Sequence, residues 1–119
     1  MKTLPSAPLY LLLLHQPHGS GPGPTPAQMR EIMAQFAQWM DGIRAAGALV
    51  SSHGLQPKGK VLRGRRGQNI SDGPYAETKE IVGGYVLIRA KNLSQATRIA
   101  RGCPGLDHRL AVEVRPIKH

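Results

Sequence analysis

The sequence LYLLLL at residues 9–14 is a continuous apolar run that contains a tyrosine, a residue common in strands. The run is short for a helix, and the segment from Pro17 to Pro26 alternates glycine and proline too closely for regular structure. A strand without polar alternation is typical of a sheet that is covered on both faces. We therefore predict a central strand that needs a layer of structure on each side.

Residues 25–47, TPAQMREIMAQFAQWMDGIRAAG, predict the helix that supplies one of these layers. Thr25 is a good N-cap, Pro26 suits the first helical position, and Gln28 completes a capping box. Apolar residues then recur at spacings of three and four, which is typical of a helix with one buried face: Met29, Ile32, Met33, Phe36, Met40 and Ile43. Gly47 favours the end of the helix.

The remaining sequence predicts a strand at 48–53, a hairpin around 64–67, a strand at 81–90, a helix capped by Asn92 and a strand at 110–114. The paired Gly83 and Gly84 indicate a bulge or a close approach of another backbone. The element order is that of the ferredoxin-like, split βαβ fold of the α+β class, as one domain over residues 1–119. Both helices then cover one face of an antiparallel sheet. We expect a second copy to cover the other face, giving a sheet-to-sheet homodimer.

The composition is that of a globular protein, because 40% of the 119 residues are apolar. The single cysteine, Cys103, excludes an internal disulfide, and we interpret it as a small buried hydrophobe. Lys2 and the apolar run resemble the start of a signal peptide, but Pro5 interrupts them and no Ala-x-Ala site follows. The run is also too short to span a bilayer, so we predict a cytoplasmic protein.

The formal net charge of +9 is densest in the predicted hairpin, at Lys58, Lys60, Arg63, Arg65 and Arg66. Such a field attracts anions, although a solvated hairpin that keeps the protein soluble has the same composition. No aromatic residues alternate with these charges, and no helix-turn-helix, zinc-finger or RNA-recognition signature accompanies them. We therefore expect neither a nucleic acid nor a membrane as partner.

The stretch DGPYAETKE at residues 72–80, followed by Gly83-Gly84-Tyr85, resembles the signature of the YCII-related family in its DGPF branch. Tyrosine stands at Tyr75, where that branch usually has phenylalanine. Shorter matches are Gly54-Leu55-Gln56-Pro57, Cys103-Pro104-Gly105 and Glu113-Val114-Arg115-Pro116, so the resemblance covers nearly the whole chain.

This resemblance implies a ferredoxin-like fold that dimerises through its sheets, with a cleft near the signature loop. It implies no single activity, and some related domains occur beside RNA polymerase sigma factors. The founding YCII branch resembles an enzyme, because a histidine in its first helix and a nearby aspartate form a pair suited to acid–base chemistry. That position falls near Phe36 in this chain, whose predicted helix has no histidine, so the YCII catalytic pair is not carried over.

Candidate catalytic residues are His15 and His53, which we place at strand ends, together with Asp72 in the signature. Either imidazole is suited to act as a general base near neutral pH, with Asp72 as the orienting carboxylate. A strand-end histidine more often hydrogen-bonds a loop, and Asp72 before Gly-Pro is also typical of an Asx turn.

The candidate binding residues of the same loop are Tyr75, Glu77 and Lys79, a phenol, a carboxylate and an amine. For Glu77 and Lys79 the alternative is simple charge pairing across strands. The histidine spacing and the glycine pattern predict neither a metal site nor a phosphate-binding loop, so we expect no metal and no cofactor.

These residues predict a protein that binds a small anionic or aromatic molecule beside the Asp-Gly-Pro-Tyr loop. If it is an enzyme, the reaction is a cofactor-free acid–base or lyase-like step, in which Lys79 or Tyr75 stabilises negative charge. The alternative is a non-catalytic interaction module linked to transcription that uses the basic hairpin. An enzyme needs a concave pocket, whereas an interaction module needs only an exposed face.

Overall fold

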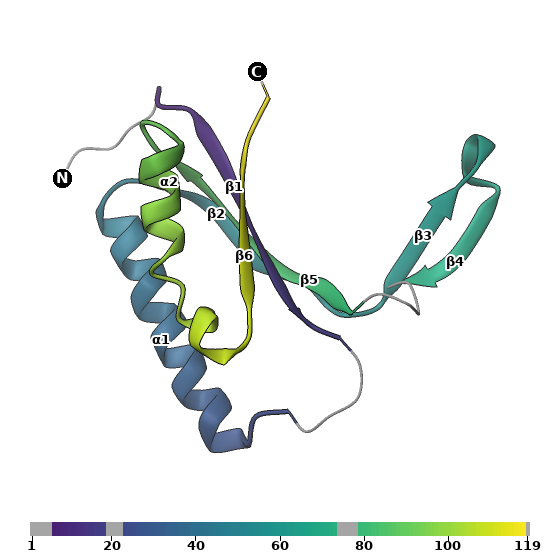
Figure 1. Cartoon of the computed structure of the whole chain (residues 1–119), viewed down its shortest axis with the longest axis horizontal. Coiled ribbons are helices and arrows are strands. Elements are labelled where there is room, and N and C mark those ends of the chain that lie inside the picture. Colours follow the sequence, from purple (N-terminus) through teal and green to yellow (C-terminus); the bar gives the residue numbers. More distant parts are fainter. Residues whose placement is uncertain (1–5, 19–22, 74–78, 119) are drawn as a thin grey trace.

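A computed structural model describes residues 6–18, 23–73 and 79–118, and its architecture is the α+β arrangement expected from the sequence (Figure 1). The elements are β1 (Leu9–Pro17), α1 (Pro26–Ala45), β2 (Leu49–Gly54), β3 (Gly59–Arg63), β4 (Asn69–Gly73), β5 (Glu80–Arg89), α2 (Leu93–Ala100) and β6 (Ala111–Pro116). Short 3₁₀ turns lie at Arg65–Gly67 and Pro104–His108. None of the helices in these ranges is long and apolar enough to cross a membrane.

The main sheet of the described residues has four antiparallel strands in the order β2-β5-β1-β6, with β1 and β5 in the centre. Both α1 and α2 lie on one face of this sheet (Figure 1). This is the ferredoxin-like topology, and the predicted fold is confirmed. The strands β3 and β4 form a separate two-stranded sheet that projects from one end of the molecule.

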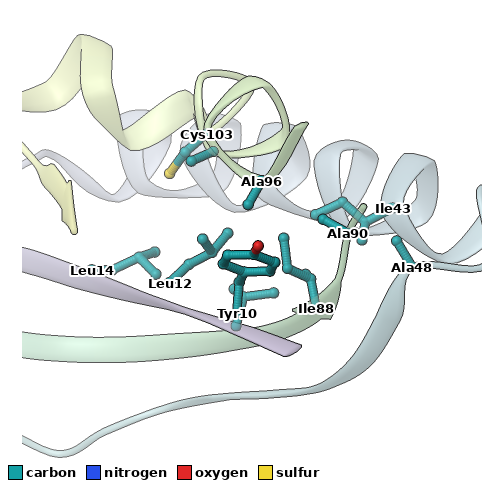
Figure 2. Close-up of a cluster of buried hydrophobic side chains, with 11 residues drawn as sticks. Tyr10, Leu12, Leu14, Ile43, Ala48, Ile88, Ala90, Ala96 and Cys103 are labelled. Carbon is teal, nitrogen blue, oxygen red and sulfur yellow. The ribbon is translucent and has the colours of Figure 1, made fainter. Parts of the chain in front are cut away.

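The hydrophobic core lies between the sheet and the two helices (Figure 2). Tyr10, Leu12 and Leu14 of β1 are buried, as every second side chain of a strand points to the same face. Leu12 and Ile88 of β5 have no exposed surface, and burying a side chain of this size contributes about 1.5–3 kcal/mol. The run LYLLLL is therefore a central strand, as predicted.

The predicted caps lie at both ends of α1 and at the start of α2. The Thr25 hydroxyl oxygen accepts a hydrogen bond from the backbone N–H of Gln28, and the Gln28 side-chain oxygen accepts one from the Thr25 N–H. Gly47, just after α1, has a φ of 74°, a left-handed conformation that glycine adopts without strain. The Asn92 side chain accepts from the Gln95 N–H and begins α2.

The apolar stripe of α1 is less buried than we predicted. Ile43 is the buried residue of this helix, whereas Met29 and Met33 in its first half are 43% and 59% exposed. The C-terminal half of α1 packs on the core through Phe36, Trp39 and Met40, and the N-terminal half has much less cover.

A β-bulge interrupts the pairing of the two central strands. Leu14 pairs with Gly84 and His15 with Val82, so that Gly83 is an extra residue on β5. A Cβ atom at Gly84 would lie 3.1 Å from the carbonyl oxygen of His53 on β2. The predicted bulge and the predicted close backbone approach are both present.

The segment between α2 and β6 contains Cys103, which is 3% exposed and packs in the core. Burial raises the pKa of its thiol from the ordinary value of 9.0, and backbone hydrogen bonds from Gly105 and Leu106 oppose this effect. Cys103 is thus the small buried hydrophobe that the sequence indicates, because a raised pKa disfavours the reactive thiolate.

Candidate functional site

The face of the main sheet opposite the helices has no covering layer among the described residues. Because Leu12 and Leu14 point to the helices, Leu11, Leu13 and His15 of β1 point to this open face. The register places Leu87 beside Leu11, so the middle of the open face is apolar. The protein therefore has an apolar surface bordered by polar residues, the arrangement of a binding or association surface.

His15 and Glu113 form a pair at one side of this face. His15 Nε2 lies 2.8 Å from Oε1 of Glu113, whose strand β6 neighbours β1. A carboxylate only accepts, so the ring donates through Nε2–H, and Nδ1 remains for proton exchange. The two side chains are 25% and 45% exposed, and the Arg115 guanidinium lies 3.8 Å from the other carboxylate oxygen.

His53 and Tyr85 form a second pair across β2 and β5. His53 Nδ1 lies 3.0 Å from the Tyr85 hydroxyl, and the ring centroids are 5.8 Å apart. Tyr85 is also the register partner of Leu13, which places its side chain on the open face with His53. The two histidine pairs thus share one face, on neighbouring rows of the sheet at the end with the bulge. We refer to this end of the open face as the histidine end.

Asp72 is held by a different group from the one we predicted. Its carboxylate accepts a hydrogen bond of 2.6 Å from the Lys60 ammonium, across the β3–β4 ladder. In the contacts that the structure describes, the carboxylate beside a histidine is Glu113. The expected Asp72–histidine pair is therefore absent from the described contacts, since β4 belongs to the projecting sheet and not to the main one.

The candidate binding residues Tyr75 and Glu77 lie outside the described residues. Lys79 is exposed just before β5, and its carbonyl oxygen accepts a 2.8 Å hydrogen bond from the backbone N–H of His18. This bond joins the chain just after β1 to the chain just before β5. Lys79 therefore lies at the histidine end of the sheet.

Sequence reasoning did not identify Glu113 and Tyr85 as site residues. Glu113 is 98 residues from His15 along the chain, so local patterns do not connect them. The available signal was the alternation of Val112, Glu113 and Val114, which places Glu113 on the face opposite the core once β6 is paired with β1. Charged and phenolic side chains on the apolar face of a sheet indicate a site or an interface.

A separate hollow of about 540 Å³ lies on the helix side of the molecule. It is open to solvent, and Trp39, Arg101 and Asp107 contribute to its walls. None of the predicted site residues that the structure describes lines this hollow. We therefore place the candidate site on the open face of the sheet, where His15 is hydrogen-bonded to a carboxylate and His53 to a phenol.

The family model for the YCII-related domain matches residues 9–119, which is nearly the whole chain. The protein therefore belongs to the YCII-related family, as its signature residues indicate. No curated protein matches the chain.

Proposed function

We propose that the protein is a homodimer that binds a small anionic or aromatic molecule at the histidine end of its open sheet face. The observation that carries this proposal is the His15–Glu113 pair at the border of an apolar face. A cleft forms there when a second copy covers the middle of the sheet. The walls are then partly apolar, with a few polar groups that fix the orientation of a ligand, as in most small-molecule sites.

The dimer is supported by the residues in the middle of the open face. Leu11 and Leu87 face each other across β1 and β5, where solvent would otherwise reach them from the uncovered side. Burial of apolar surface contributes about 25 cal/mol per Å², so covering this face favours association. A second copy presents the same apolar face and satisfies the two-fold symmetry of most homo-oligomers.

The chemistry that this arrangement supports is proton transfer without a cofactor. Glu113 accepts from Nε2–H of His15, which leaves Nδ1 to take a proton from a bound acid. We assign Glu113 the orienting role for which Asp72 was predicted, because Asp72 bonds to Lys60. The Tyr85 hydroxyl and the Lys79 ammonium are suited to stabilise negative charge on the ligand.

The test is a thermal-shift screen of the wild-type protein against small carboxylates, phosphates and phenols. A ligand at 100 times its Kd stabilises the folded protein by about 2.7 kcal/mol, which gives a clear rise in Tm. We expect His15→Ala to lose this rise and Glu113→Gln to reduce it. The matched control is His108→Ala, which changes an exposed histidine in the helix-side turn and should keep the full rise. A ligand that stabilises His15→Ala as much as the wild type would contradict the assignment.

A second candidate function, an interaction module, is supported by the projection of the basic β3–β4 hairpin from the body (Figure 1). If this hairpin held a nucleic acid, the logarithm of the binding constant would fall by about 0.9 for each phosphate contact per tenfold rise in salt. The nucleic-acid affinity should then fall steeply as the salt concentration rises. Loss of this binding in Arg65→Ala/Arg66→Ala, with binding kept in His15→Ala, would favour the interaction module over a small-molecule site.

A further inference from the structure

The β3–β4 hairpin, which we call the arm, is an incomplete structure by itself. Its strands pair with each other from Gly59–Gly73 to Arg63–Asn69 and form a sheet separate from the main one. Figure 1 shows the arm extending away from the start of β5, clear of both helices. An isolated two-stranded hairpin is marginally stable in water, so an arm of this kind needs another surface to pack on.

One face of the arm carries an apolar pair without cover. Leu62 and Ile70 are register partners, and their residues are 59% and 62% exposed. Leu62 lies over the turn at the tip, because a Cβ atom at Gly67 would come within 2.9 Å of its Cδ2. On the opposite face Val61 is partly buried, with Cγ2 3.2 Å from the Cβ position at Gly73. Leu62 and Ile70 thus form an exposed apolar pair on one face of the arm, opposite Val61.

The part of the open face in which β1 pairs with β6 is smaller in flat area than a standard dimer interface. This part is six residues long, counted by the β1–β6 register pairs, and four strands wide. At about 3.4 Å per residue and about 4.8 Å per strand, it measures about 20 by 19 Å. This is about 400 Å², roughly half of the about 800 Å² that each partner of a standard interface buries. The arm adds the missing surface if it contacts the same partner.

The overall dimensions show that the chain is more extended than a compact domain of its length. The radius of gyration is 16.2 Å, whereas a compact domain of this length has about 13–14 Å. The molecule is a slab 19 Å thick in its shortest dimension. Five paired residues per strand give the arm a length of about 17 Å, which is close to the thickness of a second slab.

We propose that the arm of each protomer packs its Leu62–Ile70 face on the second copy, so that two chains close the cleft at the histidine end. The inference rests on the proposed homodimer and assigns the arm to it. Leu55, 49% exposed at the base of the arm, donates its N–H to the Gly83 carbonyl oxygen at 2.9 Å. The exposed Leu55 thus lies where the chain leaves the main sheet for the arm, and the proposed partner covers the main sheet and the arm together.

The basic tip of the arm gives this cleft its ligand class. The turn is fixed by left-handed residues at Gly64, Arg66 and Gly67, with φ of 80°, 57° and 67°. It holds the exposed Arg65 and Arg66 at the outer end of the arm. Lys60, nearer the base of the arm, donates a hydrogen bond to the Asp72 carboxylate. In the proposed dimer these two guanidinium groups add positive charge to the surface that the arm contributes, which favours a carboxylate or phosphate ligand.

The experiment uses mixed dimers of the full chain and measures paramagnetic line broadening by NMR. One copy carries Gln68→Cys with a nitroxide at the arm tip and is not isotope-labelled, while the other copy is wild type and ¹⁵N-labelled. The buried Cys103 is protected from the labelling reagent. We expect broadened amide signals on the open face of the labelled partner. The matched control carries the nitroxide at Arg98→Cys, exposed on α2, and should broaden none of these signals.

A second pair of variants measures the contribution of the arm to association. Leu62→Ser/Ile70→Ser should raise the dimer dissociation constant by roughly tenfold or more, because it truncates a desolvated contact. Leu93→Ser changes an apolar residue of similar exposure, 49%, on the helix side and should leave the constant unchanged.

The outcomes separate this inference from the proposed dimer. Intact dimers by light scattering with no broadening from Gln68→Cys would overturn the arm contact and leave the dimer standing. A wild-type protein that is monomeric would overturn both. Binding of duplex DNA through an arm that stays exposed in the dimer would overturn the arm contact in favour of the interaction module.

Discussion

At the scale of single residues, the packing of Trp39 depends on the absence of a side chain at Gly102. The indole N–H of Trp39 donates to the Ile99 carbonyl oxygen at 3.0 Å and anchors α1 against α2. A Cβ atom at Gly102 would lie 2.9 Å from Nε1 and 3.0 Å from Cδ1 of the indole. Both atoms belong to a rigid ring, so neither moves away without shifting the whole side chain.

We therefore expect Gly102→Ala to destabilise the protein by about 1–3 kcal/mol, the usual cost of overpacking. Urea unfolding followed by fluorescence measures this change, because Trp39 is the single tryptophan of the chain. The matched control is Gly42→Ala in α1, where a Cβ atom would meet nothing within 4 Å. That change should stabilise the protein by about 0.5–1 kcal/mol, as alanine is the better helix former. Equal effects of the two substitutions would contradict the proposed role of Gly102.

At the scale of elements, the exposed first half of α1 depends on its N-cap. Thr25→Ala removes one side of the capping box and should cost about 1 kcal/mol. Hydrogen exchange of the amides in the first turns should become faster, since Met29 and Met33 provide little packing there. Thr97→Ala is the control, because its hydroxyl donates to the Leu93 carbonyl oxygen inside α2 and caps no helix end. If Thr25→Ala left the amide hydrogen exchange of these turns unchanged, the first half of α1 would be stabilised by contacts other than its N-cap.

The sequence predicted helix ends better than strand ends, for a physical reason. Thr25, Gly47 and Asn92 act on groups within a few residues of themselves, so their roles are visible locally. A strand ends where its neighbour stops pairing, and this depends on distant residues. β1 thus continues beyond His15 to Pro17, and β6 runs from Ala111 to Pro116 where residues 110–114 were predicted. Pro116 is tolerated because β6 is an edge strand.

The candidate site divides in the same way. The sequence identified His15 and His53 from their places near strand ends, and the structure puts both on the open face. Their partners come from other strands, so Glu113 and Tyr85 emerged only with the sheet register. Asp72 was predicted to orient one of these histidines, whereas the Lys60 ammonium in the adjoining strand holds this carboxylate.

At the scale of the whole molecule, the open face explains why an apolar run suited to a doubly covered strand occurs in a two-layer protein. Leu87 lies in the central strand β5 and beside Leu11 of β1, away from both histidine pairs. In a face-to-face dimer it would be near the middle of the interface. A lysine at this position would bury an unpaired ammonium in the dimer, at a cost of several kcal/mol, and would remain solvated in the free protomer.

We therefore expect Leu87→Lys to be a folded monomer of 12.9 kDa by light scattering, while the wild type has twice this mass. Circular dichroism should be unchanged, because the helix-side core is untouched. Leu93→Lys places the same charge on the exposed helix side and should remain dimeric. If Leu87→Lys were still a dimer, the partner would sit on another surface. The continuous apolar β1 would then need a different cover, and the histidine end would be an open surface instead of a cleft.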